Sequence, residues 1–206
     1  MKRGALIVLE GCDRCGKSTQ CRKLNEELAK SGVKTRLMSF PDRTTPVGQL
    51  INQYLQKVIE VPDKAIHLLF SANRWELEPK MNDLIKNGTT LVVDRYSYSG
   101  VAFSTAKNNM DVNWCWQMEI GLPKPDLVLF LEMNVNNADK RNGYGGERYE
   151  EKPFQRQVSE KFDKMRDSSW KMIDADKDIE AVHEQIMTYV KEVLDNVGDK
   201  PLQRFT

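Results

Sequence analysis

Residues 11–18 read GCDRCGKS, and the rest of the chain is best interpreted outward from this stretch. It fills every fixed position of the G-x-x-x-x-G-K-[ST] phosphate-binding loop, directly after an apolar run at 5–9 and directly before a helical pattern. Glycines at both ends let the backbone N–H groups curl around a phosphate, and the helix start adds further unpaired donors. We therefore predict a bound nucleoside triphosphate, with a glycine-rich turn kept for packing alone as the alternative.

The residue types in this loop assign the first roles. Lys17 is expected to lie along the β- and γ-phosphates, and the Ser18 hydroxyl to coordinate a Mg²⁺ ion that bridges them. The remaining loop residues of the expected ATP site are Gly11, Arg14, Cys15, Gly16 and Thr19.

Length and charge limit the class of protein. A chain of 206 residues fits a single α/β domain covering 1–206. Since 31 Lys and Arg balance 30 Asp and Glu, composition gives no support for a nucleic-acid or membrane-surface partner. The run at 5–9 is too short for a secretion signal, and no run approaches the ~20 apolar residues of a membrane span. We expect a cytoplasmic protein, with nuclear or mitochondrial presence left open.

Cys12 and Cys15 have the spacing of some redox and zinc sites, but both fall on variable positions of the loop. Because there is no second cysteine pair and His67 and His183 are isolated, small tolerated side chains are favoured over zinc ligands. Thiols acidified by Lys17 and the helix start would make the loop redox-sensitive, and this stays as an alternative.

Apolar runs alternate with helical patterns along the chain. The runs that indicate buried parallel strands are 5–9, 33–40, 89–93, 127–131 and 170–173. The helical patterns follow the loop as far as Gly32 and recur at 45–56, 62–77, 136–141, 154–165 and 179–194, with Pro79 expected to kink or restart a helix. We predict an α/β, three-layer, doubly wound sandwich with a central parallel sheet of about five strands, built around the phosphate-binding loop.

Charged residues follow two of the predicted strands. Arg43 ends the turn Phe40-Pro41-Asp42-Arg43, and Asp94 and Arg95 follow the strand at 89–93. Ligands gather at the carboxyl ends of strands in α/β sheets, so Arg43 becomes a candidate substrate contact. Asp94 is expected to be the second anchor for Mg²⁺, and Arg95 to hold a phosphate. A structural ion pair at the sheet edge is the alternative.

Two further features concern the substrates. Phe70 and Arg74 lie one helical turn apart and can project to one side, although a buried aromatic and a surface arginine is the commoner arrangement. A glycine-rich segment at about 136–150, which contains Arg141 and Arg148, predicts a lid that closes over the phosphates. A floppy surface loop is the alternative for this segment.

The internal arginines indicate the reaction class. No guanine-reading N-K-x-D segment occurs, which argues against a GTP switch. Phosphoryl transfer between two anions needs positioned cations, so the pattern favours a nucleoside monophosphate kinase. The arginines concerned are Arg14, Arg43, Arg74, Arg95, Arg141 and Arg148.

Longer segments carry a resemblance across nearly the whole chain: RGALIVLEGCDRCGKSTQ, FPDRTTPVGQL, HLLFSANRWE, LVVDRYSYSGVAF, GLPKPDLVLFLE, GERYE and DIEAVHE. In this order they resemble the eukaryotic-type thymidylate kinases. The resemblance implies transfer of the ATP γ-phosphate to dTMP, giving dTDP and ADP for dTTP synthesis, with Mg²⁺ as cofactor and a homodimeric assembly. Another pyrimidine monophosphate kinase and a non-catalytic nucleotide-binding protein are the alternatives.

The resemblance also implies residue roles. Catalysis would rest on Arg14, Lys17 and Arg95, with Arg141 and Lys177 on the ATP side. Phe70 would stack on thymine, Arg74 would bond a base carbonyl, and Arg43 and Arg95 would hold the acceptor phosphate. Asp13 would bind on the sugar-hydroxyl side, and Phe103 would crowd the position of a 2′-OH. The acceptor site would be completed by Phe40, Ser99, Gly100 and Tyr149.

Overall fold

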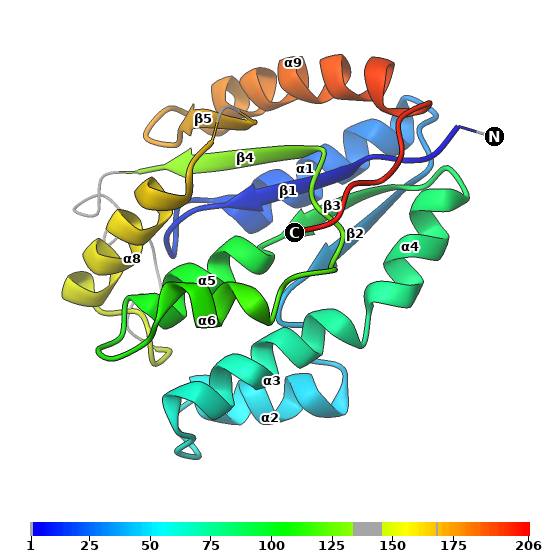
Figure 1. Cartoon of the computed structure of the whole chain (residues 1–206). Coiled ribbons are helices and arrows are strands. Elements are labelled where there is room, and N and C mark those ends of the chain that lie inside the picture. Colours follow the sequence, from blue (N-terminus) through cyan, green and yellow to red (C-terminus); the bar gives the residue numbers. More distant parts are fainter. Residues whose placement is uncertain (1, 134–145, 168) are drawn as a thin grey trace.

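The protein forms one parallel sheet whose strand order is β2-β3-β1-β4-β5, with helices on both faces (Figure 1). It is described by a computed structural model that covers residues 2–133, 146–167 and 169–206. The strands are β1 Leu6–Glu10, β2 Thr35–Ser39, β3 Thr90–Asp94, β4 Leu127–Glu132 and β5 Trp170–Asp174. The predicted α/β fold with five parallel strands is confirmed.

The described residues form eight helices. Their bounds are α1 Lys17–Lys30, α2 Pro46–Leu55, α3 Asp63–Trp75, α4 Glu78–Lys86, α5 Ser97–Thr105, α6 Val112–Gln117, α8 Lys152–Met165 and α9 Ile179–Val197. Pro79 lies in the first turn of α4, so it restarts a helix as predicted. The helix expected at 136–141 lies outside the described residues.

The central strand β1 shows how the three layers are held together. Leu6 and Val8 pack into a core shared with α4, α5 and α8, whereas Ile7 and Leu9 pack into a core shared with α1 and α9. Alternate side chains of a strand point to opposite faces, so a continuous apolar run suits a strand covered on both sides. The apolar stretch before the loop therefore anchors the phosphate-binding segment to both cores.

Helices α2 and α3 pack against each other away from the sheet (Figure 1). Their shared core contains Ile51, Tyr54 and Ile66, and Tyr149 packs against it. Thr45 begins α2 as an N-cap that accepts a 3.0 Å bond from the Gly48 N–H. No helix in the described residues is both long and apolar enough to cross a bilayer.

Candidate active site

The phosphate-binding loop lies between the carboxyl end of β1 and the start of α1. Gly11 has φ 142°, and a Cβ there would lie 2.5 Å from the Leu131 carbonyl oxygen on β4, so this close approach requires glycine. Lys17 is buried, and its Nζ donates to the Cys12 carbonyl oxygen at 2.6 Å. The ammonium is thus folded back across the loop that is expected to hold phosphate.

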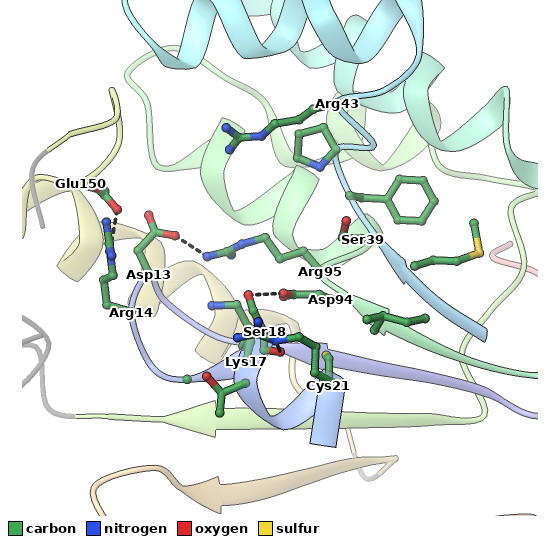
Figure 2. Close-up of a pocket in the computed structure, with 17 residues that line it drawn as sticks. Asp13, Arg14, Lys17, Ser18, Cys21, Ser39, Arg43, Asp94, Arg95 and Glu150 are labelled. Atoms are coloured by element: carbon green, nitrogen blue, oxygen red, sulfur yellow. Dashed lines mark hydrogen bonds and ion pairs between the residues drawn. The ribbon is translucent and has the colours of Figure 1, made fainter. Parts of the chain in front are cut away.

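A cavity of about 860 Å³ opens over this loop (Figure 2). Its walls come from the loop, the ends of β2 and β3, and the segment after residue 145. The polar residues predicted for this site that line it are Asp13, Arg14, Lys17, Ser18, Thr19, Arg43, Asp94 and Arg95. The structure therefore brings together residues that are widely spaced in the sequence.

Ser18 and Asp94, the two predicted metal ligands, are in direct contact. The Ser18 hydroxyl donates to the Asp94 carboxylate, because β3 lies beside β1 in the sheet (Figure 2). A hydroxyl and a carboxylate oxygen at one point are hard donors of the kind that Mg²⁺ prefers. The pair fits the predicted metal.

Arg95 is held against the loop from the end of β3. Its guanidinium donates to the Asp13 carboxylate and to the Gly11 carbonyl oxygen, the latter at 3.1 Å. It also lies over the Phe103 ring, with 5.1 Å between Cζ and the ring centroid. Arg95 and Arg14 have φ values of 63° and 65°, and non-glycine residues in this strained region concentrate at functional sites.

Four consecutive residues, 147–150, reach different parts of the site. Glu150 Oε1 accepts a 2.9 Å bond from Arg14 Nε, and Glu147 accepts 2.7 and 3.1 Å bonds from Arg43. Burial alone would raise the pKa of Glu150, but the bonds from Arg14 and from backbone N–H groups hold that pKa below its usual value. Two arginines of the cavity are therefore already engaged by carboxylates from the predicted lid.

The other two residues of this segment attach it to neighbouring helices. Arg148 donates to the Tyr54 carbonyl oxygen at 3.0 Å and to Glu60 at 2.6 Å, so it contacts the end of α2. Arg148 does not line the large cavity in this structure, and the predicted closure of the lid over the phosphates stays a prediction. Tyr149 stacks on Phe154 with 5.1 Å between ring centroids.

A second cavity, of about 100 Å³, adjoins the first. The two share lining residues, namely Asp13, Phe40, Pro41, Arg43 and Arg95. The second is further lined by Phe70, Arg74, Ser99, Gly100, Phe103 and Tyr149, all of which were predicted on the acceptor side.

Arg74 is buried in this second cavity, which corrects the alternative of a surface arginine. Its Nε and Nη2 donate to Glu119 at 2.7 and 2.5 Å, and both side chains are buried. A Cβ on Gly100 would lie 2.5 Å from Arg74 Nη2, so glycine is needed for this packing. The pair gives the guanidinium one orientation.

A third cavity, of about 290 Å³, lies on the other side of the loop. Its lining includes Gly16, Thr19, Gln20 and Lys177, from the loop, α1 and the segment before α9. Lys177 thus lies next to the loop, and its assignment to the ATP side stays a prediction. Arg141, predicted for the same side, lies outside the described residues.

The Cys12 thiol of the loop is not acidified. Burial raises the pKa of the Cys12 thiol to about 11, which is the reverse of the acidification that a redox-sensitive loop requires. Cys15 is buried, with its Sγ 3.5 Å from Lys17 Nζ. Among the described residues no cluster of three or more His, Cys, Asp or Glu is arranged to bind a metal.

Several supporting residues were missed from the sequence. Glu10, fully buried at the end of β1, accepts bonds from the backbone N–H groups of Tyr96 and Ser99 at 2.9 and 3.1 Å. Burial raises the pKa of Glu10. The Gln155 amide binds Asp13 twice, at 2.8 Å to its N–H and 2.6 Å to its carboxylate. An acidic residue at the end of an apolar strand could have marked Glu10 as a site residue, whereas no sequence pattern distinguishes Gln155.

Asn73 is a further residue without a sequence signal. Its side chain is buried, accepts a 2.7 Å bond from the Asp42 N–H and donates to the Asp42 carbonyl oxygen at 3.2 Å. These bonds hold the turn that carries Arg43. Asn73 therefore links α3 to the acceptor side of the cavity.

Comparisons with known proteins agree with this geometry. The family model described as "Thymidylate kinase" matches residues 9–186. The chain belongs to the thymidylate kinase family. It is 52% identical to a human thymidylate kinase over 98% of this chain and 96% of the relative, and 50% identical to a zebrafish (Danio rerio) thymidylate kinase over the same shares. Against a solved structure of thymidylate kinase from Candida albicans, with 37% identity, the TM-score is 0.92 and both chains are covered fully.

Membership in the thymidylate kinase family confirms the resemblance drawn from the sequence segments. The match also confirms the P-loop kinase fold, because the aligned structure covers 100% of this chain. The roles of individual residues remain predictions, although most of the predicted residues line the connected cavities.

Proposed function

We propose that this thymidylate kinase transfers the γ-phosphate of ATP to dTMP across the junction of the two connected cavities. The observation that carries the proposal is the shared lining, in which Arg43 and Arg95 belong to both cavities. ATP phosphates would occupy the cavity over the loop, and dTMP would enter the smaller cavity with its phosphate toward the junction. The two reacting phosphates then meet among fixed cations, which is what phosphoryl transfer requires.

The donor phosphates would be bound by the loop. Backbone N–H groups of 11–18 and the Lys17 ammonium would hold the β- and γ-phosphates, and Arg14 would neutralise charge on the phosphoryl group in flight. Ser18 and Asp94 would hold Mg²⁺, which when bound supplies positive charge to the phosphate oxygens. Lys177, which lines the third cavity, would contact the adenine side. Gly11, Cys15, Gly16 and Thr19 would complete the loop.

The acceptor would be oriented by the smaller cavity. Phe70 would stack on the base, Arg74 would donate to a base carbonyl, and Phe103 would exclude a 2′-OH. Arg43 and Arg95 would bind the acceptor phosphate as planar donors. Because that phosphate is already an anion, the reaction needs no strong general base. Asp13, Phe40, Ser99, Gly100 and Tyr149 would form the remaining walls.

A coupled assay of ADP release tests this proposal. With ATP and Mg²⁺ we expect the fastest turnover on dTMP, slower turnover on dUMP, and little on UMP, CMP, AMP or GMP. Lys17→Ala provides the background, and Asp94→Asn should raise the Mg²⁺ concentration needed for half-maximal rate by at least ~10-fold. Preference for another acceptor would overturn the assignment of the base cavity, and no turnover with any acceptor would favour a binding protein.

We also propose that the chain forms a homodimer. Exposed apolar side chains gather on α3 and beside α6, where Trp75 Nε1 donates to the Met118 carbonyl oxygen. They are Leu68, Trp75, Val112 and Ile120. Light scattering should give twice the chain mass, and Leu68→Glu should reduce it to one chain. A wild-type monomer at tens of micromolar would refute this assembly.

A cytoplasmic location belongs to the same proposal. All four cysteines are free, which suits a reducing compartment where ATP is available. Fractionation of cells that express the tagged chain tests this location, and recovery in a secreted fraction would contradict it.

A further inference from the structure

Ser104 lines the smaller cavity, and its hydroxyl is hydrogen-bonded to a buried histidine. Ser104 lines that cavity from α5, and its Oγ is 2.7 Å from His67 Nδ1 on α3. His67 has no exposed surface, and its ring packs against Trp114 with 5.3 Å between centroids. The Ser104–His67 pair is therefore a fixed polar contact beside the position proposed for the base.

The other ring nitrogen decides which atom carries the proton. His67 Nε2 lies 3.2 Å from the Cys115 carbonyl oxygen, which can accept a hydrogen bond but cannot donate one. We assign the proton to Nε2, which meets this carbonyl at hydrogen-bond distance, so that Nδ1 of the neutral ring is the acceptor; the Gly100 backbone is a further hydrogen-bonding neighbour of the ring. Burial lowers the pKa of His67, so the neutral ring is the form present at neutral pH.

This tautomer gives the Ser104 hydroxyl a single polarity. Its proton is directed to His67 Nδ1, so the oxygen offers lone pairs to anything else that contacts it. Arg74 offers the opposite polarity in the same cavity, because Nε and Nη2 are engaged by Glu119 and Nη1 has no hydrogen-bond partner among the described residues. The cavity thus contains one oriented donor and one oriented acceptor.

We infer that Ser104, held by His67, accepts a hydrogen bond from the imide N–H of the thymine ring and thereby helps to reject cytosine. A thymine or uracil edge has a carbonyl oxygen next to an N–H donor, which matches Arg74 Nη1 and Ser104 Oγ. A cytosine edge has an amino donor next to an unprotonated nitrogen, which would face each group with the wrong polarity. This inference rests on the proposed function; Ser104 is its specificity residue and His67 a positioning residue.

The test compares dTMP with dCMP at saturating ATP and Mg²⁺. Ser104→Ala should raise the KM for dTMP about 10-fold with kcat within about threefold, and should lower the dTMP-to-dCMP ratio of kcat/KM by at least a similar factor. Ser104→Thr, which keeps the hydroxyl, should retain most of the ratio. Thr105→Val is the matched control, because the Thr105 hydroxyl donates to the Val101 carbonyl oxygen at 2.8 Å and does not line the cavity.

His67 is tested through its effect on Ser104. In His67→Phe the Ser104 hydroxyl is free to rotate and donate, so the dTMP-to-dCMP ratio should fall, while adding His67→Phe to Ser104→Ala should not lower it further. Nitrogen-15 spectra of the wild-type chain should show a protonated Nε2 and an unprotonated Nδ1 for His67. A purely structural role for His67 predicts additive losses and no dependence on Ser104.

The proposed function and the Ser104 role fail in different experiments. A wild-type chain that does not phosphorylate dTMP refutes the proposed function. Wild-type activity on dTMP, together with a Ser104→Ala ratio within twofold of wild type or an equal effect of Thr105→Val, overturns the Ser104 assignment alone. A protonated Nδ1 in the spectra would also overturn it, because the hydroxyl would then be able to donate to the base.

Discussion

Arg14 Nε donates a 2.9 Å hydrogen bond to Glu150 Oε1, which joins the phosphate-binding loop directly to the segment that follows residue 145. The second oxygen of the same carboxylate accepts bonds from the Gly146 and Glu147 N–H groups at 2.9 and 3.2 Å. One carboxylate therefore orders both the loop arginine and the backbone of the segment. The position of Arg14 depends on this contact as well as on its own strained backbone.

Replacement of Arg14 by alanine should slow phosphoryl transfer far more than it weakens ATP binding. We expect kcat to fall by ~10²- to 10⁴-fold, because a cation aimed at the transferring group acts mainly in the transition state. Steady-state kinetics and ATP titration measure the two effects separately. Arg156→Ala, an exposed arginine on α8, is the control. Near-normal turnover in Arg14→Ala would show that another group performs this role.

Replacement of Glu147 by glutamine should tighten dTMP binding. Glu147 and the acceptor phosphate would compete for Arg43, and the ion pair is partly exposed, with 42% and 36% of the two side chains accessible. Such pairs contribute at most ~1 kcal/mol, so the KM for dTMP should fall by about threefold to fivefold. The difference should shrink in high salt. Glu151→Gln, a neighbouring exposed carboxylate, should leave the KM unchanged; a higher KM in Glu147→Gln would mean that the carboxylate assists binding.

Replacement of Gly100 by alanine should damage the acceptor cavity. The added Cβ would lie 2.5 Å from Arg74 Nη2, so the buried Arg74–Glu119 pair must shift. We expect a loss of ~1–3 kcal/mol in the free energy of unfolding together with a higher KM for dTMP. Urea unfolding and kinetics measure these effects. In the control Gly198→Ala the nearest atoms belong to the flexible Lys2 side chain, and stability should change little.

Stability should decrease as the pH falls from 7.5 to 5.5, in part because of His67. Burial is the main cause that lowers its pKa below 6.5, and nearby Arg74 acts in the same direction while Glu119 opposes it. Between the folded and unfolded pKa values of His67, the unfolded chain binds a proton that the folded chain does not. The contribution of neutral His67 to the free energy of unfolding is therefore complete above about pH 6.5, and it is lost as the pH falls. Each such group adds up to ~1.4 kcal/mol per pH unit to the slope.

Urea unfolding at several pH values measures this slope for the wild type and for His67→Phe. The variant should have a shallower slope, with a remainder from His183, whose pKa burial also lowers. Equal slopes in the two proteins would show that His67 takes up a proton in the folded chain as readily as in the unfolded one.

The loop and strands could be predicted because their signals are local. The spacing of the glycines, Lys17 and Ser18 encodes the phosphate loop, and a run such as Leu6–Glu10 is apolar because both faces of the strand are covered. Helix α5 gave no comparable signal, since seven of its nine residues are buried and no apolar stripe remains. Helix α6 has six residues, too few for a periodic pattern.

The partners of the site residues could not be predicted, because they depend on packing between distant segments. Glu119 is 45 positions from Arg74 in the sequence, and Gln155 is 142 positions from Asp13. The direction of the Arg148 side chain is a similar case. The sequence places Arg148 near the site, but it does not show that Arg148 bonds to Tyr54 and Glu60. Residue types in the loop predicted phosphate binding. The carboxylates and amides that orient those residues are brought to them only by the tertiary fold.

The contacts made by residues 147–150 have a consequence for how this chain can change in evolution. Glu147 reaches the turn after β2, Arg148 reaches α2, and Glu150 reaches the phosphate loop, all within four positions. A single inserted or deleted residue between Glu147 and Glu150 would put at least one of these side chains out of reach of its partner. The spacing of this segment should therefore persist among functional descendants even where its residue types drift.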